Sequence, residues 1–312
     1  MKKPTLAIGI PAHNEGKNIG SLLESILKQQ QTFYVLESVI VVCDGCADNT
    51  VSVVKEFTQN HRYIKLLAFN KRLGKSVALN KIYALCKSDF LLTFDADVVL
   101  ERSIEIELMI KEMLRDDKIN LVGGRFILVK QKTLMGKLSY VSFVSFEDAF
   151  LKLNGGNNFF ALVGAASLIR KRLYKSFTYP KATISDQNYL FAMALRIDQR
   201  GFRVAKDTRI LMRPVSTFND WRTLGARSVV ADKENIAHFL GKGILQRYYM
   251  PRSLYFKSLL KWFFKTPFYT TGAIAMNIFI RAFPYRKAVH TDGTWDLTHS
   301  SKETIVSEQS QD

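Results

Sequence analysis

The sequence predicts an α/β protein with a mostly parallel sheet, helices on both faces, and a C-terminal helical appendage rich in basic and aromatic residues. Short apolar runs alternate with segments of helical hydrophobic spacing through the first third of the chain. These runs do not alternate with polar residues, which indicates strands buried on both faces. The length of 312 residues, 47% of them hydrophobic, suits one large domain with an appendage.

The expected elements follow one another in strand–helix order. Apolar runs at 5–10, 38–43, 64–69 and 90–94 are expected strands, and the segments 19–27, 53–57 and 75–87 are expected helices. Further along, 121–129 and 202–205 are expected strands, 133–153 and 186–200 expected helices, and 154–158 a loop. We expect a main domain over 1–216, a helical region over 217–290 and a polar, disordered tail over 291–312.

Polar residues follow the expected strands, and ligands of such sheets bind at the carboxyl ends of the strands. Asp95 and Asp97 close the fourth strand, and alternate residues of a strand face the same way. Their hard oxygen atoms suit Mg²⁺ or Mn²⁺ completed by substrate phosphates. The alternative is a solvated turn after the strand, because Asp-x-Asp is a short and common pattern.

The other strand ends carry further candidates. Asp44 follows the second strand and is placed to hydrogen-bond a nucleobase, while residues 11–15 open the first helix and expose backbone N–H groups suited to a nucleotide. Lys71 and Arg72 precede Gly74 and Lys75 at a helix entrance, where cations can neutralise a diphosphate. Turn formation and solvated loop charges remain the alternatives for these residues.

Taken in order, the segments 10–15, 43–50, 74–80 and 94–97 resemble the family 2 glycosyltransferases, which have the GT-A fold. The resemblance covers roughly residues 5–214. It implies an inverting transfer of a sugar from a nucleotide-diphosphate donor, with a uridine diphosphate sugar favoured, to a hydroxyl acceptor that is a glycan or is lipid-linked. It also implies a divalent metal, Mg²⁺ or Mn²⁺, on the diphosphate.

The resemblance assigns roles to individual residues. The metal falls to Asp95 and Asp97, and the general base to Asp186, which follows Ser185 where the family often has a second acid. Helix capping is the rival interpretation of Asp186. The donor nucleotide falls to Pro11, Ala12, Asn14, Glu15, Asp44, Lys71, Arg72, Lys75 and Asp95. Small residues at 164–167 lie where the family lines its sugar pocket.

Processive members of the family carry a Gln-x-x-Arg-Trp motif after the base. The nearest stretch here, 224–228, offers Arg227 but neither the Gln nor the Trp. We therefore expect a non-processive enzyme that adds one sugar, or a short extension, to its acceptor.

The net charge of +17 implies an anionic partner. No Asp or Glu occurs between residues 235 and 291, and Lys257, Lys261 and Lys265 share one helical face among Trp, Phe and Leu. This composition predicts a helix lying on an anionic membrane surface. The uncharged stretch 266–280 is too short for a confident span and contains Gly272 and Asn277. The alternative is a core helix with its lysines in solvent.

The N-terminal apolar run is too short for a signal peptide, so we expect a cytoplasmic protein, peripheral on the cytoplasmic face of the membrane. Three cysteines do not predict a disulfide framework. A nucleic-acid binder would not place carboxylates at strand ends, so no nucleic acid is expected. No G-x-G-x-x-G follows the first strand, which disfavours a nicotinamide enzyme. A nucleotide-binding relative without catalysis, or a basic protein that binds nucleic acid or a membrane, stays as the alternative, and the oligomeric state is open.

Overall fold

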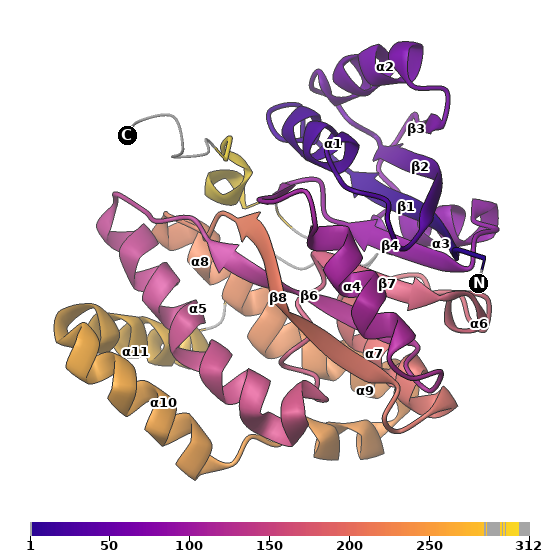
Figure 1. Cartoon of the computed structure of the whole chain (residues 1–312). Helices are drawn as coiled ribbons and strands as arrows, with labels where there is room; N and C mark the ends of the chain where they lie inside the picture. Colours follow the sequence, from indigo (N-terminus) through magenta and orange to yellow (C-terminus); the bar gives the residue numbers. More distant parts are fainter. Residues whose placement is uncertain (1, 284, 286–293, 295, 297, 306–312) are drawn as a thin grey trace.

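The computed structural model describes residues 2–283, 285, 294, 296 and 298–305. An eight-stranded sheet in the order β3-β2-β1-β4-β7-β6-β8-β5 runs through the molecule (Figure 1). Its strands are β1 (Thr5–Ala12), β2 (Val35–Asp44), β3 (Ile64–Phe69), β4 (Phe90–Phe94), β5 (Val98–Leu100), β6 (Leu121–Leu128), β7 (Ala166–Arg170) and β8 (Phe202–Met212).

The helices are α1 (Ile19–Leu27), α2 (Thr50–Asn60), α3 (Lys75–Leu85), α4 (Glu105–Leu114), α5 (Leu134–Lys152), α6 (Lys171–Tyr174), α7 (Asp186–Ile197), α8 (Phe218–Gly225), α9 (Asp232–Leu240), α10 (Arg252–Lys265) and α11 (Pro267–Ala282). Short 3₁₀ turns span Leu153–Gly156, Lys242–Tyr248 and His299–Lys302, and a π-helical turn spans Ala226–Ala231.

The half of the sheet formed by β1 to β4 is parallel throughout. β2 lies between β1 and β3, and β1 also pairs with β4, all in the same direction. The other half is mixed, because β7 runs antiparallel to both β4 and β6, while β6 and β8 are parallel. The predicted mostly parallel sheet is confirmed, and each antiparallel pair involves β7 or β5, since β5 also runs antiparallel to β8.

Two hydrophobic cores cover the two faces of the sheet, which confirms the predicted layers. Residues of α1 and α4, such as Leu22 and Met109, pack on one face. Residues of α3 and α7, such as Ile82 and Phe191, pack on the other. The approach of α3 to the sheet is close, since a Cβ atom on Gly9 of β1 would lie 2.4 Å from Ile82 Cγ2. Helix and strand burial together hold the carboxyl ends of β1, β2 and β4 at one edge.

The C-terminal helices form a third packing layer. α10 and α11 lie beside α5, on the side of the molecule away from α2 and β3 (Figure 1). Ala273 and Ile280 of α11 join Leu138 and Val141 of α5 in a small core with Trp221. α10 ends at Lys265 and Pro267 begins α11, so the uncharged stretch after α10 forms a packed helix.

The described part of the expected tail is packed. Residues His299–Lys302 form a 3₁₀ turn, and the side chain of Ile305 is only 7% exposed. A disordered tail is therefore wrong for residues 298–305, whereas 291–293 and 306–312 lie outside the described residues. The proposed boundaries at residues 216 and 290 remain predictions. Within the described chain, no helix has both the length and the apolar character needed to cross a membrane.

Candidate active site

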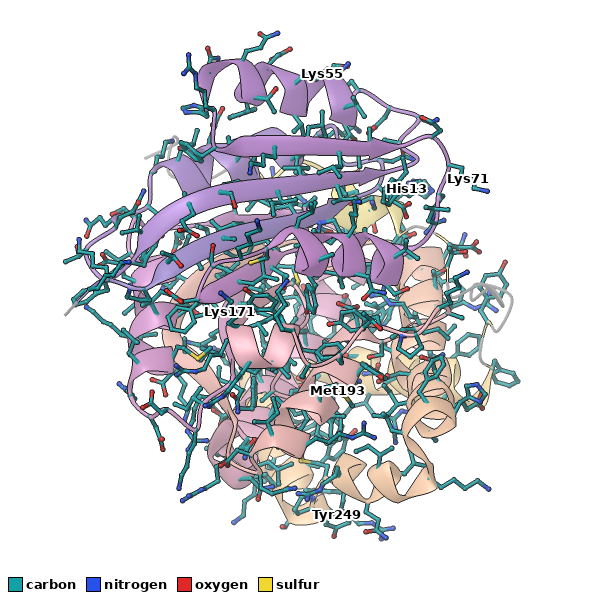
Figure 2. All side chains as sticks on the ribbon, turned by 90° about the vertical axis from the view of Figure 1, so that its right-hand side faces the viewer. His13, Lys55, Lys71, Lys171, Met193 and Tyr249 are labelled. Atoms are coloured by element: carbon teal, nitrogen blue, oxygen red, sulfur yellow. The ribbon has the colours of Figure 1, made fainter. Side chains whose placement is uncertain are left out.

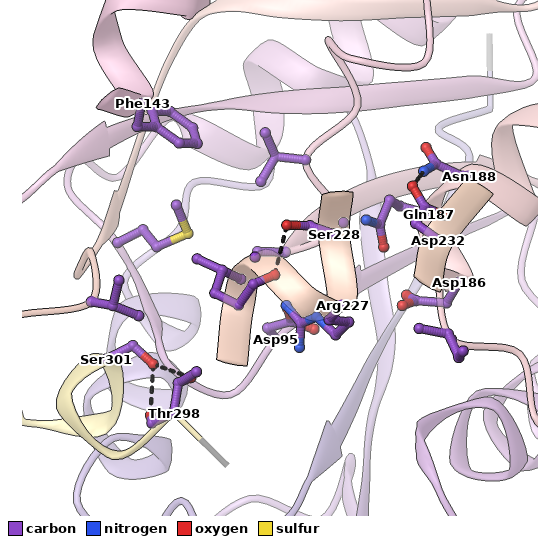
Figure 3. Close-up of a pocket in the computed structure, with 18 of the residues that line it drawn as sticks. Asp95, Phe143, Asp186, Gln187, Asn188, Arg227, Ser228, Asp232, Thr298 and Ser301 are labelled. Carbon is purple, nitrogen blue, oxygen red and sulfur yellow. Dashed lines mark hydrogen bonds between the residues drawn. The ribbon is translucent and has the colours of Figure 1, made fainter. Parts of the chain in front are cut away.

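A cavity of about 930 Å³ opens at the carboxyl ends of β1, β2 and β4. It gathers most of the predicted site residues: Pro11, Ala12, Glu15, Asp44, Arg72, Lys75, Asp95, Asp97 and Asp186. Asn14 and Lys71 are not among its lining residues. Residues beyond position 216 also line it, including Arg227 and Asp232, so the cavity crosses the predicted domain boundary. Figure 3 shows Asp95, Asp186, Arg227 and Asp232 gathered in one part of this cavity.

Asp95 and Asp97 both face the cavity just after β4. The backbone N–H of Asp95 donates to the carbonyl of Ala165 at 3.0 Å, which fixes the start of this turn. Burial and the negative charge of Asp95 raise the pKa of Asp97 to about 6. Two half-buried carboxylates whose negative charges act on each other fit a hard divalent cation. Among the described residues, no group of three or more His, Cys, Asp or Glu side chains forms a closed metal site.

Lys75 links the expected metal site to the expected base. Its Nζ lies 2.7 Å from Asp95 Oδ1 and 3.1 Å from Asp186 Oδ2. Burial alone lowers the pKa of Lys75, but the Asp186 and Asp95 carboxylates raise it above its ordinary value. Lys75 begins α3 directly after Gly74, whose φ of 98° is open to glycine and strained for other residues. This turn aims the ammonium group into the cavity.

Asp186 is the first residue of α7, and Ser185 occupies the N-cap position without a side-chain capping bond. The carboxylate of Asp186 therefore does not cap the helix from the N-cap position and instead pairs with Lys75. Its side chain is 12% exposed, which leaves it accessible to the cavity. Both the helix start and the Lys75 ion pair hold the carboxylate in one orientation.

Asp44 holds the loop that follows β3. Its Oδ1 accepts the backbone N–H of Leu73 at 2.7 Å, and its Oδ2 accepts that of Gly74 at 2.8 Å. A Cβ atom on Gly45, where φ is 62°, would lie 2.3 Å from the backbone N of Arg72, so the turn requires glycine. The loop places Arg72 on the cavity wall, while Lys71 points away from the body of the molecule (Figure 2).

Residues 11–15 form the wall beside Asp44. Asn14 has a positive φ of 54°, and its Oδ1 accepts the N–H of Ala47 at 2.8 Å, so this side chain orders the turn. Glu15 lines the cavity, and burial and the charge of Asp97 raise its pKa to about 7. His13, which was not among the predicted site residues, also lines the cavity. Its Nδ1 atom lies 2.6 Å from the backbone carbonyl oxygen of Asp44.

Two further charged residues come from the region after β8. Arg227 lies in the π-helical turn. Burial lowers the pKa of its guanidinium group, whereas the negative charges of Asp95 and Asp186 act in the opposite direction. Asp232 begins α9, accepts a hydrogen bond from Asn188 Nδ2, and has its pKa raised to about 6 by burial. The sequence offered a partial signal for Arg227 in the incomplete Gln-x-x-Arg-Trp motif and no signal for Asp232. π-helical turns are themselves frequent at functional sites.

The segment 298–305 supplies another cation. Lys302 Nζ forms an ion pair with Glu15 and donates to the carbonyl of His13 at 2.8 Å. Arg213 Nη2 donates to the carbonyl of Thr304 at 2.6 Å, and Ser300 N donates to Asp220 Oδ2 at 2.7 Å, which fixes the segment beside the cavity. Thr298 and Ser301 line the cavity in Figure 3. No sequence motif marked these residues.

The rest of the cavity has a different chemistry. Four rings from three segments line it, and we call them the aromatic wall: Phe146, Phe150, Phe160 and Tyr255. Phe143 of α5 lies across the cavity from Asp95 and Asp186 in Figure 3. The polar residues therefore form one side of the cavity, and apolar rings form the other.

The sheet order and the carboxylates gathered at its strand ends define a protein of the GT-A class. In agreement with this fold, a mannosyltransferase from Pyrobaculum calidifontis, solved with GDP-Man and Mn²⁺, aligns over 90% of this chain and 76% of its own. The TM-score is 0.54 and the sequence identity 17%.

The sequence model of glycosyl transferase family 2 matches residues 7–177, and the chain belongs to this family. It is 30% identical over 148 residues to a probable glycosyltransferase, YdaM, of Bacillus subtilis. It is 24% identical over 173 residues to a poly-beta-1,6-N-acetyl-D-glucosamine synthase of Staphylococcus epidermidis. These matches cover 46% and 54% of this chain but only 35% and 40% of the two relatives.

Proposed function

We propose that the protein is an inverting, non-processive glycosyltransferase that moves a sugar from a nucleotide-diphosphate donor to a hydroxyl acceptor. One observation carries this proposal: Lys75 Nζ contacts Asp95 and Asp186 at once, at 2.7 and 3.1 Å. The carboxylate assigned to the metal and the carboxylate assigned to the base therefore face the same small volume. A donor diphosphate and an acceptor hydroxyl can meet only if these two groups share one cavity.

The diphosphate end of the donor is assigned to the charged side of the cavity. Asp95 and Asp97 would hold Mg²⁺ or Mn²⁺, which would stabilise the charge that develops on the leaving diphosphate. Lys75, Arg72 and Arg227 add positive charge from the protein itself, fixed before the donor arrives. Lys71, which does not line the cavity, is left out of this set.

The nucleoside end of the donor is assigned to Pro11, Ala12, Glu15 and the loop that Asp44 orders. Both oxygens of Asp44 accept loop amides, so we propose that Asp44 shapes this subsite through residues 73 and 74. Asn14 acts in the same indirect way through Ala47. A uridine diphosphate sugar is the donor that we propose.

Asp186 is proposed as the general base. It would accept the proton of the acceptor hydroxyl as that oxygen attacks the sugar from the face opposite the diphosphate. A positioned carboxylate contributes about 10²- to 10⁴-fold to such a proton transfer. Lys75 positions Asp186 before the acceptor binds, because the ion pair fixes the carboxylate beside the metal site.

The helices α10 and α11 are proposed as the surface that contacts an anionic membrane on its cytoplasmic face. Large apolar side chains are exposed there, with Phe256 at 70%, Phe264 at 77% and Phe268 at 70%. Lys257 and Lys265 are exposed on the same helix as Phe256 and Phe264. Lys261 Nζ forms an ion pair with Asp148 Oδ2 of α5 at 3.3 Å. Exposed rings interleaved with lysines suit a lipid headgroup region.

Ligand-induced stabilisation of the full chain tests the proposed donor. Uridine and guanosine diphosphate sugars are compared with and without Mn²⁺, and a ligand present at 100 times its dissociation constant stabilises by about 2.7 kcal/mol. We expect a rise in melting temperature with a uridine diphosphate sugar only when Mn²⁺ is present. Equal behaviour with and without the cation would contradict the metal assignment. Donor binding without any transfer or donor hydrolysis would favour a non-catalytic relative.

A further inference from the structure

The aromatic wall is a continuous stack of rings. Phe160 and Phe150 lie 5.4 Å apart between ring centroids, Phe150 and Phe146 lie 6.0 Å apart, and Phe146 and Tyr255 lie 4.8 Å apart. The interplanar angles are 18°, 19° and 23°, so the rings present nearly parallel faces. The stack runs from the loop before β7, across α5, to α10. It thus connects the region of the sugar pocket with the helix pair whose outer face is apolar.

Aromatic rings can stack on a nucleobase, a sugar ring or an alkyl chain, so the neighbouring lining residues and charges decide between these occupants. Where α11 faces α5, the two polar side chains are engaged with each other, since Asn277 Nδ2 donates to Ser142 Oγ at 2.8 Å. Leu162 and Ile280, both nearly fully buried, complete the apolar lining. Apolar surface facing a water-filled cavity costs about 25 cal/mol per Å², so an apolar occupant is favoured.

The charges around the wall indicate an anionic group on that occupant. Arg252, at the start of α10, and Arg281, near the end of α11, both line the cavity. Neither side chain has a hydrogen bond or an ion pair within the part of the chain that the structure describes. None of the described cavity residues on α5, α10 and α11 is acidic. An arginine without a partner on a cavity wall is a ready site for a phosphate.

We propose that the acceptor is a lipid-linked phosphate compound. Its long apolar chain lies on the aromatic wall, its phosphate contacts Arg252 and Arg281, and its hydroxyl-bearing head reaches Asp186. This inference rests on the proposed function, since it names the acceptor of that transfer. The new glycosidic bond forms from the acceptor oxygen to the sugar carbon, the bond to the diphosphate breaks, and the acceptor proton passes to Asp186. The nucleoside diphosphate leaves with the electron pair.

The exposed rings of α10 and α11 agree with this assignment. Phe256 on the outer face of α10 is 70% exposed, and Tyr249, which lines the cavity just before α10, is 69% exposed. A chain that leaves the cavity past α10 would enter a membrane on which this helix pair rests. The acceptor therefore would not need to leave the bilayer completely in order to react.

Calorimetry with soluble alkyl phosphates tests the proposal without donor, metal or vesicles. Hexyl, octyl and decyl phosphate share one head group, and inorganic phosphate is the reference. We expect affinity to rise by up to about fourfold per added methylene, because each buried CH₂ contributes about 0.8 kcal/mol. An affinity that does not change with chain length, or that matches inorganic phosphate, would overturn the proposal. Stronger binding of a soluble oligosaccharide than of decyl phosphate would do the same.

Matched variants on one helix locate the site. Tyr255→Ala removes a ring of the wall and should weaken decyl phosphate binding at least tenfold, whereas Phe256→Ala removes the neighbouring outward ring and should leave it unchanged. Arg252→Glu should weaken binding of every alkyl phosphate, with Lys257→Glu as its control. Equal effects of the two variants within either pair would overturn the assignment. If Tyr255→Ala does not fold, the comparison of Arg252→Glu with Lys257→Glu still tests it, because both residues are exposed. Donor binding with Mn²⁺, measured separately, shows whether the proposed function fails independently.

Discussion

The two sides of the cavity are built by different means. The charged side is built around the ends of β1, β2 and β4, where parallel pairing brings the segments that carry Glu15, Asp44 and Asp95 to one edge. Lys75 at the start of α3 and Asp186 at the start of α7 complete it. The aromatic wall consists of side chains from α5, α10 and a loop, which meet only through helix packing. Strand pairing therefore fixes where the charged residues at the strand ends lie. The positions of the rings depend instead on how the side chains of neighbouring helices pack.

This difference should also separate the effects of mutation. Substitutions on the charged side should change catalysis and leave binding of an apolar ligand intact. Substitutions in the helical layer should change acceptor or membrane binding and leave the donor site intact.

Asp186→Asn should lower the rate of transfer by about 10²- to 10⁴-fold, because an amide cannot accept the acceptor proton. Donor affinity should change little, since Asn keeps the size of the side chain. Single-turnover transfer and donor calorimetry on the same preparation measure the two quantities. Retention of full activity would remove Asp186 from the reaction and break the assignment of the charged side.

Lys75→Met should lower kcat/KM by about 10²-fold, in the range found when one preorganised charge-stabilising group is removed. The substitution removes the cation between Asp95 and Asp186 while keeping the length of the side chain. Lys75→Arg is the matched control and should recover part of the lost rate. If Met and Arg give the same rate, the charge of Lys75 has no role in catalysis.

Replacing Lys257, Lys261 and Lys265 together with Glu should release the protein from vesicles rich in anionic lipid. Each basic residue near such a surface contributes about 1 kcal/mol, so the loss in partitioning should exceed tenfold. The control replaces the exposed Lys55, Lys65 and Lys81, which lie on α2, β3 and α3. Figure 2 shows Lys55 at the end of the molecule opposite Tyr249. Equal co-sedimentation of both triple variants would eliminate the membrane proposal.

The smallest effect concerns stability against pH. Burial raises the pKa of Asp232 from 3.8 to about 6, so the folded state holds its proton more tightly than the unfolded state. The free energy of unfolding should therefore fall by about 2 kcal/mol through this group as pH rises from about 4 to about 6, out of about 3 kcal/mol over the whole titration. Asp232→Asn should flatten that part of the curve in urea titrations. An unchanged slope would show that Asp232 does not carry this shift.

The charged side was largely predictable from the sequence. The apolar runs of β1 to β4 marked strand ends, and strand ends marked Asp44, Asp95 and Asp97. The three-residue strand β5 and the helix α4 between β5 and β6 formed no part of the prediction, and β5 is too short to show a period.

The helical side was not predictable in the same way. Phe146 and Phe150 are spaced as core residues of any helix, and nothing in their spacing indicates that they face a cavity.

Some charged residues were not predictable either. Asp232 and Lys302 reach the site through α9 and the segment 298–305, whose positions depend on tertiary packing. Lys71 and Arg72 are adjacent in sequence, and only the folded loop that Asp44 holds shows that Arg72 lines the cavity and Lys71 does not.

The proposed metal site after β4 is tested most directly by the metal dependence of donor binding in wild type and Asp97→Asn. Calorimetric titration of a uridine diphosphate sugar into each protein, with Mn²⁺ and with chelator, gives four affinities. We expect tight binding of the donor only for wild type with Mn²⁺. Wild type with chelator, and Asp97→Asn under both conditions, should bind the donor equally weakly. Equal affinity of wild type and Asp97→Asn in Mn²⁺ would contradict the claim that the carboxylates after β4 hold the cation that binds the diphosphate.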